Sequence, residues 1–192
     1  MRSRILPYII LPAFLLFVIA SWGGAKETTA QSTTASAVKT PKGAATTGDY
    51  PANLTQLMRG MLFTESNVIF AAGGKNPDDV PQARMPSAAT DPLTGTYGKW
   101  EAVENSSLAI IEVANLLTAP GRLCSNGRRV PTTNADWPKL VQSLRDAGMK
   151  SYQAAQAKNQ DKILDAADIL TMACNNCHVK YLATPNLEDR CR

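Results

Sequence analysis

Two cysteines and a histidine near the C-terminus carry the clearest chemistry in this sequence. Cys174 and Cys177 are separated by two residues, and His178 follows directly. At this spacing a c-type haem is attached, because each thiol adds to one vinyl group and the imidazole ligates the iron. His178 is also the only histidine of the chain. The motif therefore predicts one covalently bound haem c, with Cys174 and Cys177 as attachment points and His178 as the proximal iron ligand.

A Cys-x-x-Cys pair also occurs in redox-active dithiols and in zinc sites. A closed zinc site needs four ligands, and the remaining cysteines, Cys124 and Cys191, form no second Cys-x-x-Cys pair. A thioredoxin-like dithiol is expected within a βαβ pattern, which does not surround this motif. A haem-free thiol or zinc protein is therefore kept as an alternative to the haem protein.

The other two cysteines, Cys124 and Cys191, form a leftover pair. Oxidising compartments allow such a pair to form a disulfide, so we expect a Cys124–Cys191 bridge if the protein is exported. The alternative is two unpaired thiols.

The N-terminus has the pattern of an export signal. Arg2 and Arg4 precede an apolar run from Ile5 to Ala20, and small residues follow. As a helix this run would span about 24 Å, short of a hydrocarbon core of roughly 30 Å. Residues 1–25 are therefore predicted to be a signal peptide that sends the protein to the periplasm. The alternative is an uncleaved anchor, in which residues 5–25 form a membrane tether.

Residues 26–49 are rich in Thr, Ala and Ser and lack apolar periodicity. Such a composition cannot bury enough surface to offset chain entropy, so we predict a flexible linker. Residues 50–192 then form a single cytochrome domain.

Four segments of this domain repeat apolar residues at steps of three and four, which is typical of amphipathic helices. No stretch alternates like a strand, so the fold class is all-α. Four helices with one apolar face each favour an antiparallel up-down-up-down four-helix bundle, with a Pro-rich loop at residues 75–98. The bundle would bring the start of the first helix, the loop with Cys124 and the haem motif to one end. The predicted helices are 53–74, 100–117, 136–152 and 159–182.

A sixth iron ligand would have to come from another side chain, because the chain has no second histidine. Met58 lies at about the depth of His178 in the bundle, whereas Met61 lies about 4.5 Å deeper. Thioether sulfur opposite histidine is a known haem pairing that raises the reduction potential. Met58 is the first candidate and Met61 the second; a lysine or an empty site is the alternative.

Several side chains near the same end are candidates for contact with the haem. Tyr181 lies one helical turn after His178 and is expected to pack against the haem edge. Cations suit the haem propionates, and the sequence offers five equivalent candidates, which are Arg59, Arg122, Arg128, Arg129 and Lys180.

A helical bundle whose last helix ends in Cys-x-x-Cys-His-x-x-Tyr resembles the cytochrome c′ family, including its low-spin Met/His-ligated relatives. The resemblance spans roughly residues 53–182. It implies that Cys174 and Cys177 carry the haem, that His178 is the proximal ligand and that the first helix supplies the sixth-site residue. The chain departs from the family pattern one turn before the distal-site residue, where the family often has an arginine and this chain has Leu54 before Met58 and Leu57 before Met61. It also departs at Leu182, where a basic residue is frequent, and in its Pro-rich loop and extra cysteines.

These features predict a periplasmic cytochrome that transfers electrons to and from redox partner proteins. The alternative is a five-coordinate protein that binds NO or CO. The formal net charge of +4 falls to +2 without Arg2 and Arg4, and no basic cluster is present, so nucleic acid is not expected as a partner. No set of catalytic residues is recognisable, so we do not expect an enzyme. A homodimer is compatible with the resemblance.

Overall fold

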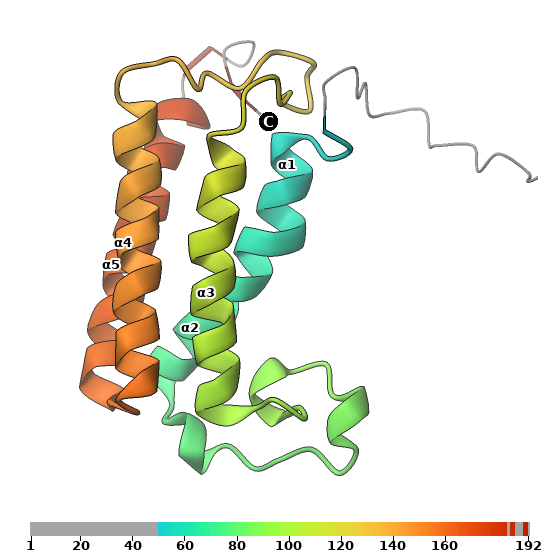
Figure 1. Ribbon diagram of the computed structural model, residues 1–192, viewed down its shortest axis with the longest axis vertical. Coiled ribbons are helices and arrows are strands. Elements are labelled where there is room, and N and C mark those ends of the chain that lie inside the picture. The colour runs from blue at the N-terminus through green and yellow to red at the C-terminus, as the bar shows by residue number, and fades with distance from the viewer. Residues whose placement is uncertain (1–49, 184, 187–189, 192) are drawn as a thin grey trace, which may run out of the picture. The chain divides into compact units, whose positions relative to one another are not determined.

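The computed structural model, shown in Figure 1, describes residues 50–183, 185–186 and 190–191. Over these residues the chain is helical and has no β-strand, apart from an isolated bridge between Leu123 and Arg129. The all-α prediction is therefore confirmed for this part of the chain. The predicted signal and linker, residues 1–25 and 26–49, lie outside the described residues. None of the described helices is long and apolar enough to cross a membrane.

The first helical segment begins at the residue that the sequence predicts. The Asn53 side chain accepts a hydrogen bond from the Gln56 N–H, and the Gln56 side chain accepts one from the Asn53 N–H, each at 2.9 Å. This reciprocal capping box satisfies two N–H groups that a helix start leaves unpaired. The segment consists of α1 (Leu54–Leu57), a π-helical turn (Met58–Leu62) and α2 (Phe63–Gly74). The π-turn was not predicted.

Three further helices complete the fold, and the sequence predicts each of them. They are α3 (Lys99–Leu117), α4 (Trp137–Gln156) and α5 (Gln160–Tyr181). Asn159 caps α5, because its side chain accepts a hydrogen bond from the Lys162 N–H at 2.9 Å.

The four helical segments pack around one apolar core (Figure 1). α3 packs against α2 and α4, and α5 packs against α2 and α4, so each segment contacts two neighbours. The largest fully buried side chains include Trp100, Trp137, Ile110, Ile163 and Leu170. Burial of one apolar face from each helix is the main stabilising contribution in such an arrangement. The structure thus shows a helical bundle.

The loop between α2 and α3 has structure of its own. It contains three 3-10 turns, η2 (Pro77–Asp79), η3 (Pro86–Ala88) and η4 (Pro92–Thr94), each with proline at its start. The Trp100 indole N–H donates to the Asp78 carboxylate at 3.1 Å, which holds the loop to α3. Its Leu93 side chain is buried. The loop covers part of the core.

The connection between α3 and α4 lies against the start of α1. The Leu54 N–H donates to the Leu123 carbonyl at 2.8 Å, and the Arg122 guanidinium donates to the Ala52 carbonyl at 2.6 Å. The Trp137 indole N–H donates to the Leu117 carbonyl at 3.0 Å, which joins the start of α4 to the end of α3. These bonds place the Cys124 loop beside the first helical segment.

Candidate functional site

A cavity of about 610 Å³ lies between the first helical segment and α5. This volume is within the range of small-molecule and cofactor sites, which is roughly 300–1,000 Å³. The first helical segment forms one wall of the cavity and α5 forms the other. Trp137 of α4 and Cys191 complete the lining. The lining residues are Leu54, Thr55, Met58, Arg59, Leu62, Phe63, Ser66, Phe70, Trp137, Thr171, Cys174, Asn175, Cys177, His178, Tyr181, Leu182 and Cys191.

The structure brings all three residues of the Cys-x-x-Cys-His motif into this cavity. Residues three and four apart share a helix face, so α5 places Cys174 beside Cys177 and His178. Ile163 and Leu170 turn the adjacent face of α5 into the core, which fixes the rotation of the helix. Cys174 and Cys177 are half-buried and are not in a disulfide, and His178 is exposed.

The cavity wall disfavours the ionised form of both motif thiols in the haem-free chain. Burial raises the pKa of the Cys174 thiol. Burial, together with the nearby Cys174 and Asp136, raises the pKa of Cys177 to about 11. The thiolate is the nucleophilic form of cysteine, and redox-active dithiols carry a lowered pKa. The environment of this pair is therefore the opposite of that in an activated dithiol.

The two methionine candidates occupy different positions. Met58 is half-buried, packs against the core and lines the same cavity as His178. Met61 is 39% exposed and does not line the cavity. The wider π-turn between Met58 and Leu62 changes the angular position of the residues within it, which simple helical spacing does not anticipate. Of the two methionines, Met58 alone lines the cavity that His178 also lines.

The candidate partners of the propionates also differ in whether they line the cavity. Arg59 lines the cavity, whereas Arg122, Arg128 and Arg129 do not. The Arg122 side chain is buried, donates to the Leu116 and Ala52 carbonyls, and lies 4.5 Å from the centre of the Tyr50 ring. Its role is to hold the chain at the entry to α1.

A polar cluster at the end of α5 fixes Tyr181, which also lines the cavity. The Tyr181 hydroxyl donates to the Asp136 carboxylate at 2.9 Å and accepts from the Asn134 amide at 3.3 Å. Its ring meets the Trp137 ring edge-on, with centroids 4.9 Å apart. The Lys180 ammonium group forms an ion pair with the Asp136 carboxylate at 2.5 Å. A haem propionate would have to compete with Asp136 for this cation.

The same cluster shifts three pKa values. The hydrogen bond from Lys180 holds the pKa of Asp136 below its usual value, and that bond raises the pKa of Lys180. Burial raises the pKa of the Tyr181 hydroxyl, so the neutral phenol is favoured. All three shifts favour the forms present at neutral pH, and the cluster stays intact there.

Cys124 and Cys191 are joined in a disulfide, which is the pairing expected from the sequence. Their Cα atoms are 5.0 Å apart, and the two residues are separated by 67 positions. Because both sulfurs are in the bridge, neither can join Cys174 and Cys177 as a thiolate ligand of zinc. Among the described residues, no group of three or more His, Cys, Asp or Glu side chains is placed to hold a metal ion.

Two aromatic side chains of the cavity were not singled out from the sequence. Phe63 and Phe70 are 67% and 38% exposed, and both line the cavity. They lie seven residues apart on the first helical segment and outside its buried stripe, which is the signal that could have found them. Large apolar side chains left exposed around a concave surface indicate that something covers them.

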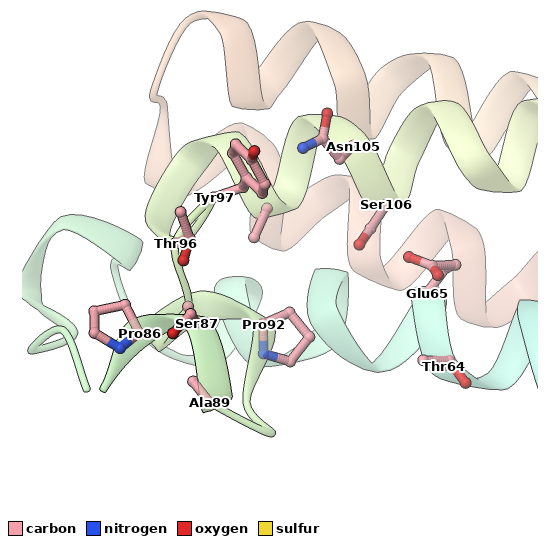
Figure 2. A pocket seen from close by; sticks show the side chains of 12 residues that line it. Thr64, Glu65, Pro86, Ser87, Ala89, Pro92, Thr96, Tyr97, Asn105 and Ser106 are labelled. Atoms are coloured by element: carbon pink, nitrogen blue, oxygen red, sulfur yellow. The ribbon is translucent and has the colours of Figure 1, made fainter. Parts of the chain in front are cut away.

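A second cavity, of about 580 Å³, lies between the Pro-rich loop, α2 and α3 (Figure 2). Glu65, Tyr97 and Asn105 are among its polar side chains, and no cysteine or histidine lines it. Its chemistry differs from that of the motif-bearing cavity. In comparisons with protein-family models, curated proteins and solved structures, nothing matches this chain.

Proposed function

We propose that this protein is a periplasmic c-type cytochrome that carries one covalent haem and transfers electrons. The observation that carries the proposal is the shared cavity: both free thiols and the histidine of the motif line one largely apolar space of about 610 Å³. The residues present fit a haem, because that group needs two thiols, an imidazole and apolar walls. The helices fit an antiparallel up-down-up-down bundle of the cytochrome c′ kind, ending in the haem-attachment motif.

Each residue of the motif has a distinct role in this proposal. Cys174 and Cys177 hold the haem through thioether bonds, and α5 fixes their spacing. His178 is the proximal iron ligand. When bound, the haem supplies one-electron chemistry at its iron. Met58 is the proposed sixth ligand, because it lines the cavity from the opposite helical segment.

The remaining walls would exclude water and orient the group. Leu62, Phe63 and Phe70 present apolar surface from the first helical segment, and Trp137 does so from α4. Arg59 is the proposed partner of a propionate, because a cation at the cavity wall favours a carboxylate. Tyr181, held by Asp136, would pack against the haem edge. Such a preorganised apolar site would keep rearrangement of the protein small during electron transfer.

A second candidate function is the binding of NO or CO at an open sixth position. The observation that favours it is the apolar character of the wall around Met58, where Leu54 and Leu62 also line the cavity. Such a wall admits small uncharged ligands. If the Met58 side chain only packs, the site would bind gas instead of relaying electrons.

The proposed compartment is the periplasm, with residues 1–25 as signal or anchor. The Cys124–Cys191 disulfide supports this, because such bonds persist in oxidising compartments. The proposed partners are redox proteins.

The test is a mass and spectroscopic measurement on the exported, purified protein. Mass spectrometry should show one haem attached through Cys174 and Cys177. Optical and EPR spectra in both redox states should be low-spin, with a sulfur–iron charge-transfer band, and should not change with CO. A high-spin spectrum that shifts with CO would favour gas binding. Absence of covalent haem, with zinc bound, would refute the cytochrome.

A further inference from the structure

Cys191 lies beyond the end of α5, thirteen residues after His178, and lines the same cavity as the Cys-x-x-Cys-His motif. Three interactions hold this part of the chain in place. The disulfide ties Cys191 to the buried Cys124, and the Cys191 N–H donates to the Tyr181 carbonyl at 3.2 Å. The Asn126 amide donates to the Arg190 carbonyl at 2.7 Å. Two of these three interactions start from the loop between α3 and α4.

The position of Cys191 at the end of α5 gives it a second role besides cross-linking. Tyr181, whose carbonyl it caps, and His178 both line the cavity with it. The Cys191 residue is half-buried and packs against the core. Its side chain therefore occupies space at the cavity wall that water would otherwise reach.

We propose that Cys191, held in place by its disulfide to Cys124, forms part of the wall of the haem site, where it limits water contact with the cofactor and raises its reduction potential. This inference rests on the proposed cytochrome function. Ferric haem carries one more positive charge than ferrous haem, so water stabilises the ferric form more strongly. Burial and the local dielectric are among the means by which a protein sets a haem potential. A tethered apolar wall thus favours the reduced state.

The test compares the wild-type haem protein with the double variant Cys124→Ala/Cys191→Ala. Spectroelectrochemistry should give a lower midpoint potential in the variant. Hydrogen exchange at the last turn of α5, residues 178–182, should become faster, which is a readout that does not depend on the haem. An unchanged potential in a variant that carries its haem would overturn the inference.

A matched control separates a wall effect from general loss of stability. Val113 is 1% exposed on α3 and does not line the cavity. Val113→Ala should lower stability while leaving the potential and the exchange of residues 178–182 unchanged. If Val113→Ala lowers the potential as much as loss of the disulfide, the wall has no specific role.

A second measurement applies even where the double variant does not fold. A phosphine reduces the disulfide of the folded wild-type protein to two thiols and takes up oxygen from water to become the phosphine oxide, while the thioether bonds remain. After the phosphine is removed under argon, the midpoint potential should again be lower. Wild-type protein without covalent haem would refute the proposed function; haem-bearing protein with equal potentials before and after reduction would refute only this inference.

Discussion

The Cys124–Cys191 disulfide should contribute a large part of the stability of this domain. It closes a loop between residues 67 positions apart. A cross-link restricts the unfolded chain, and for a loop of this length the chain-entropy estimate is about 4 kcal/mol. A haem bound at Cys174 and Cys177 closes only a short loop within α5, so it would not replace this constraint.

The perturbation is the double substitution Cys124→Ala/Cys191→Ala. Alanine is preferred to serine because Cys124 is 2% exposed, and a buried hydroxyl without a partner would add a desolvation cost of about 1–3 kcal/mol. We expect the free energy of unfolding to fall by about 4 kcal/mol. For a domain of this size the midpoint of thermal unfolding should fall by roughly 10–15 °C.

The assay is urea unfolding followed by circular dichroism, with and without a thiol reductant. Reductant should lower the stability of the wild type by the same amount as the substitution and should leave the variant unchanged. The m-value should rise when the disulfide is lost, because the unfolded chain becomes less compact and unfolding exposes more surface. A loss below about 1 kcal/mol in both comparisons would contradict the entropic argument, since the loop is long.

Further predictions concern the iron ligands and the polar cluster. Met58→Ala should abolish the sulfur–iron band and lower the reduction potential, because a thioether ligand raises it, whereas Met61→Ala should change neither; the reverse result would move the ligand to Met61. His178→Ala should retain covalent haem by mass spectrometry but change its optical spectrum, and an unchanged spectrum would exclude His178 as ligand. The pKa of Asp136 is lowered and that of Lys180 is raised, so the stability difference between wild type and Asp136→Asn should be constant through neutral pH. It should shrink as the pH falls below the unfolded value of Asp136, 3.8, and as it rises above that of Lys180, 10.5, in urea titrations.

Sequence patterns predicted the helices because local signals and core burial agree in this chain. Asn53 and Asn159 are favourable N-caps, and both hold their helices in the structure. Apolar residues recur at helical spacing, and most of them are buried. α4 continues to Gln156, one turn past Tyr152, the last residue of the apolar face recognised in the sequence, and Ala154 and Ala155 extend its buried face.

The π-turn from Met58 to Leu62 was beyond the reach of periodicity. A pattern of three- and four-residue steps assumes one helical pitch, and it cannot place a single wider turn. The turn matters for the candidate site, because Met58 and Met61 are the same residue type and differ in their depth along the helix and in their rotation about its axis. The structure puts Met58 in the cavity and leaves Met61 39% exposed.

The candidate site likewise has one part that local sequence predicts, the motif, and one part that depends on tertiary packing, the cavity walls. Attachment of a haem depends on covalent spacing within one helical turn, so the Cys-x-x-Cys-His motif is readable without a fold. The cavity walls depend on contacts between residues far apart in the sequence. The Trp137 ring of α4 packs against the Tyr181 ring of α5, and the disulfide to Cys124 holds Cys191 at the cavity. In the proposed cytochrome, such walls would set solvent access, and they would set the potential together with the axial ligands. If the proposed haem is bound, the choice between electron transfer and gas binding therefore lies with the residues that tertiary packing brings to the cavity, above all Met58.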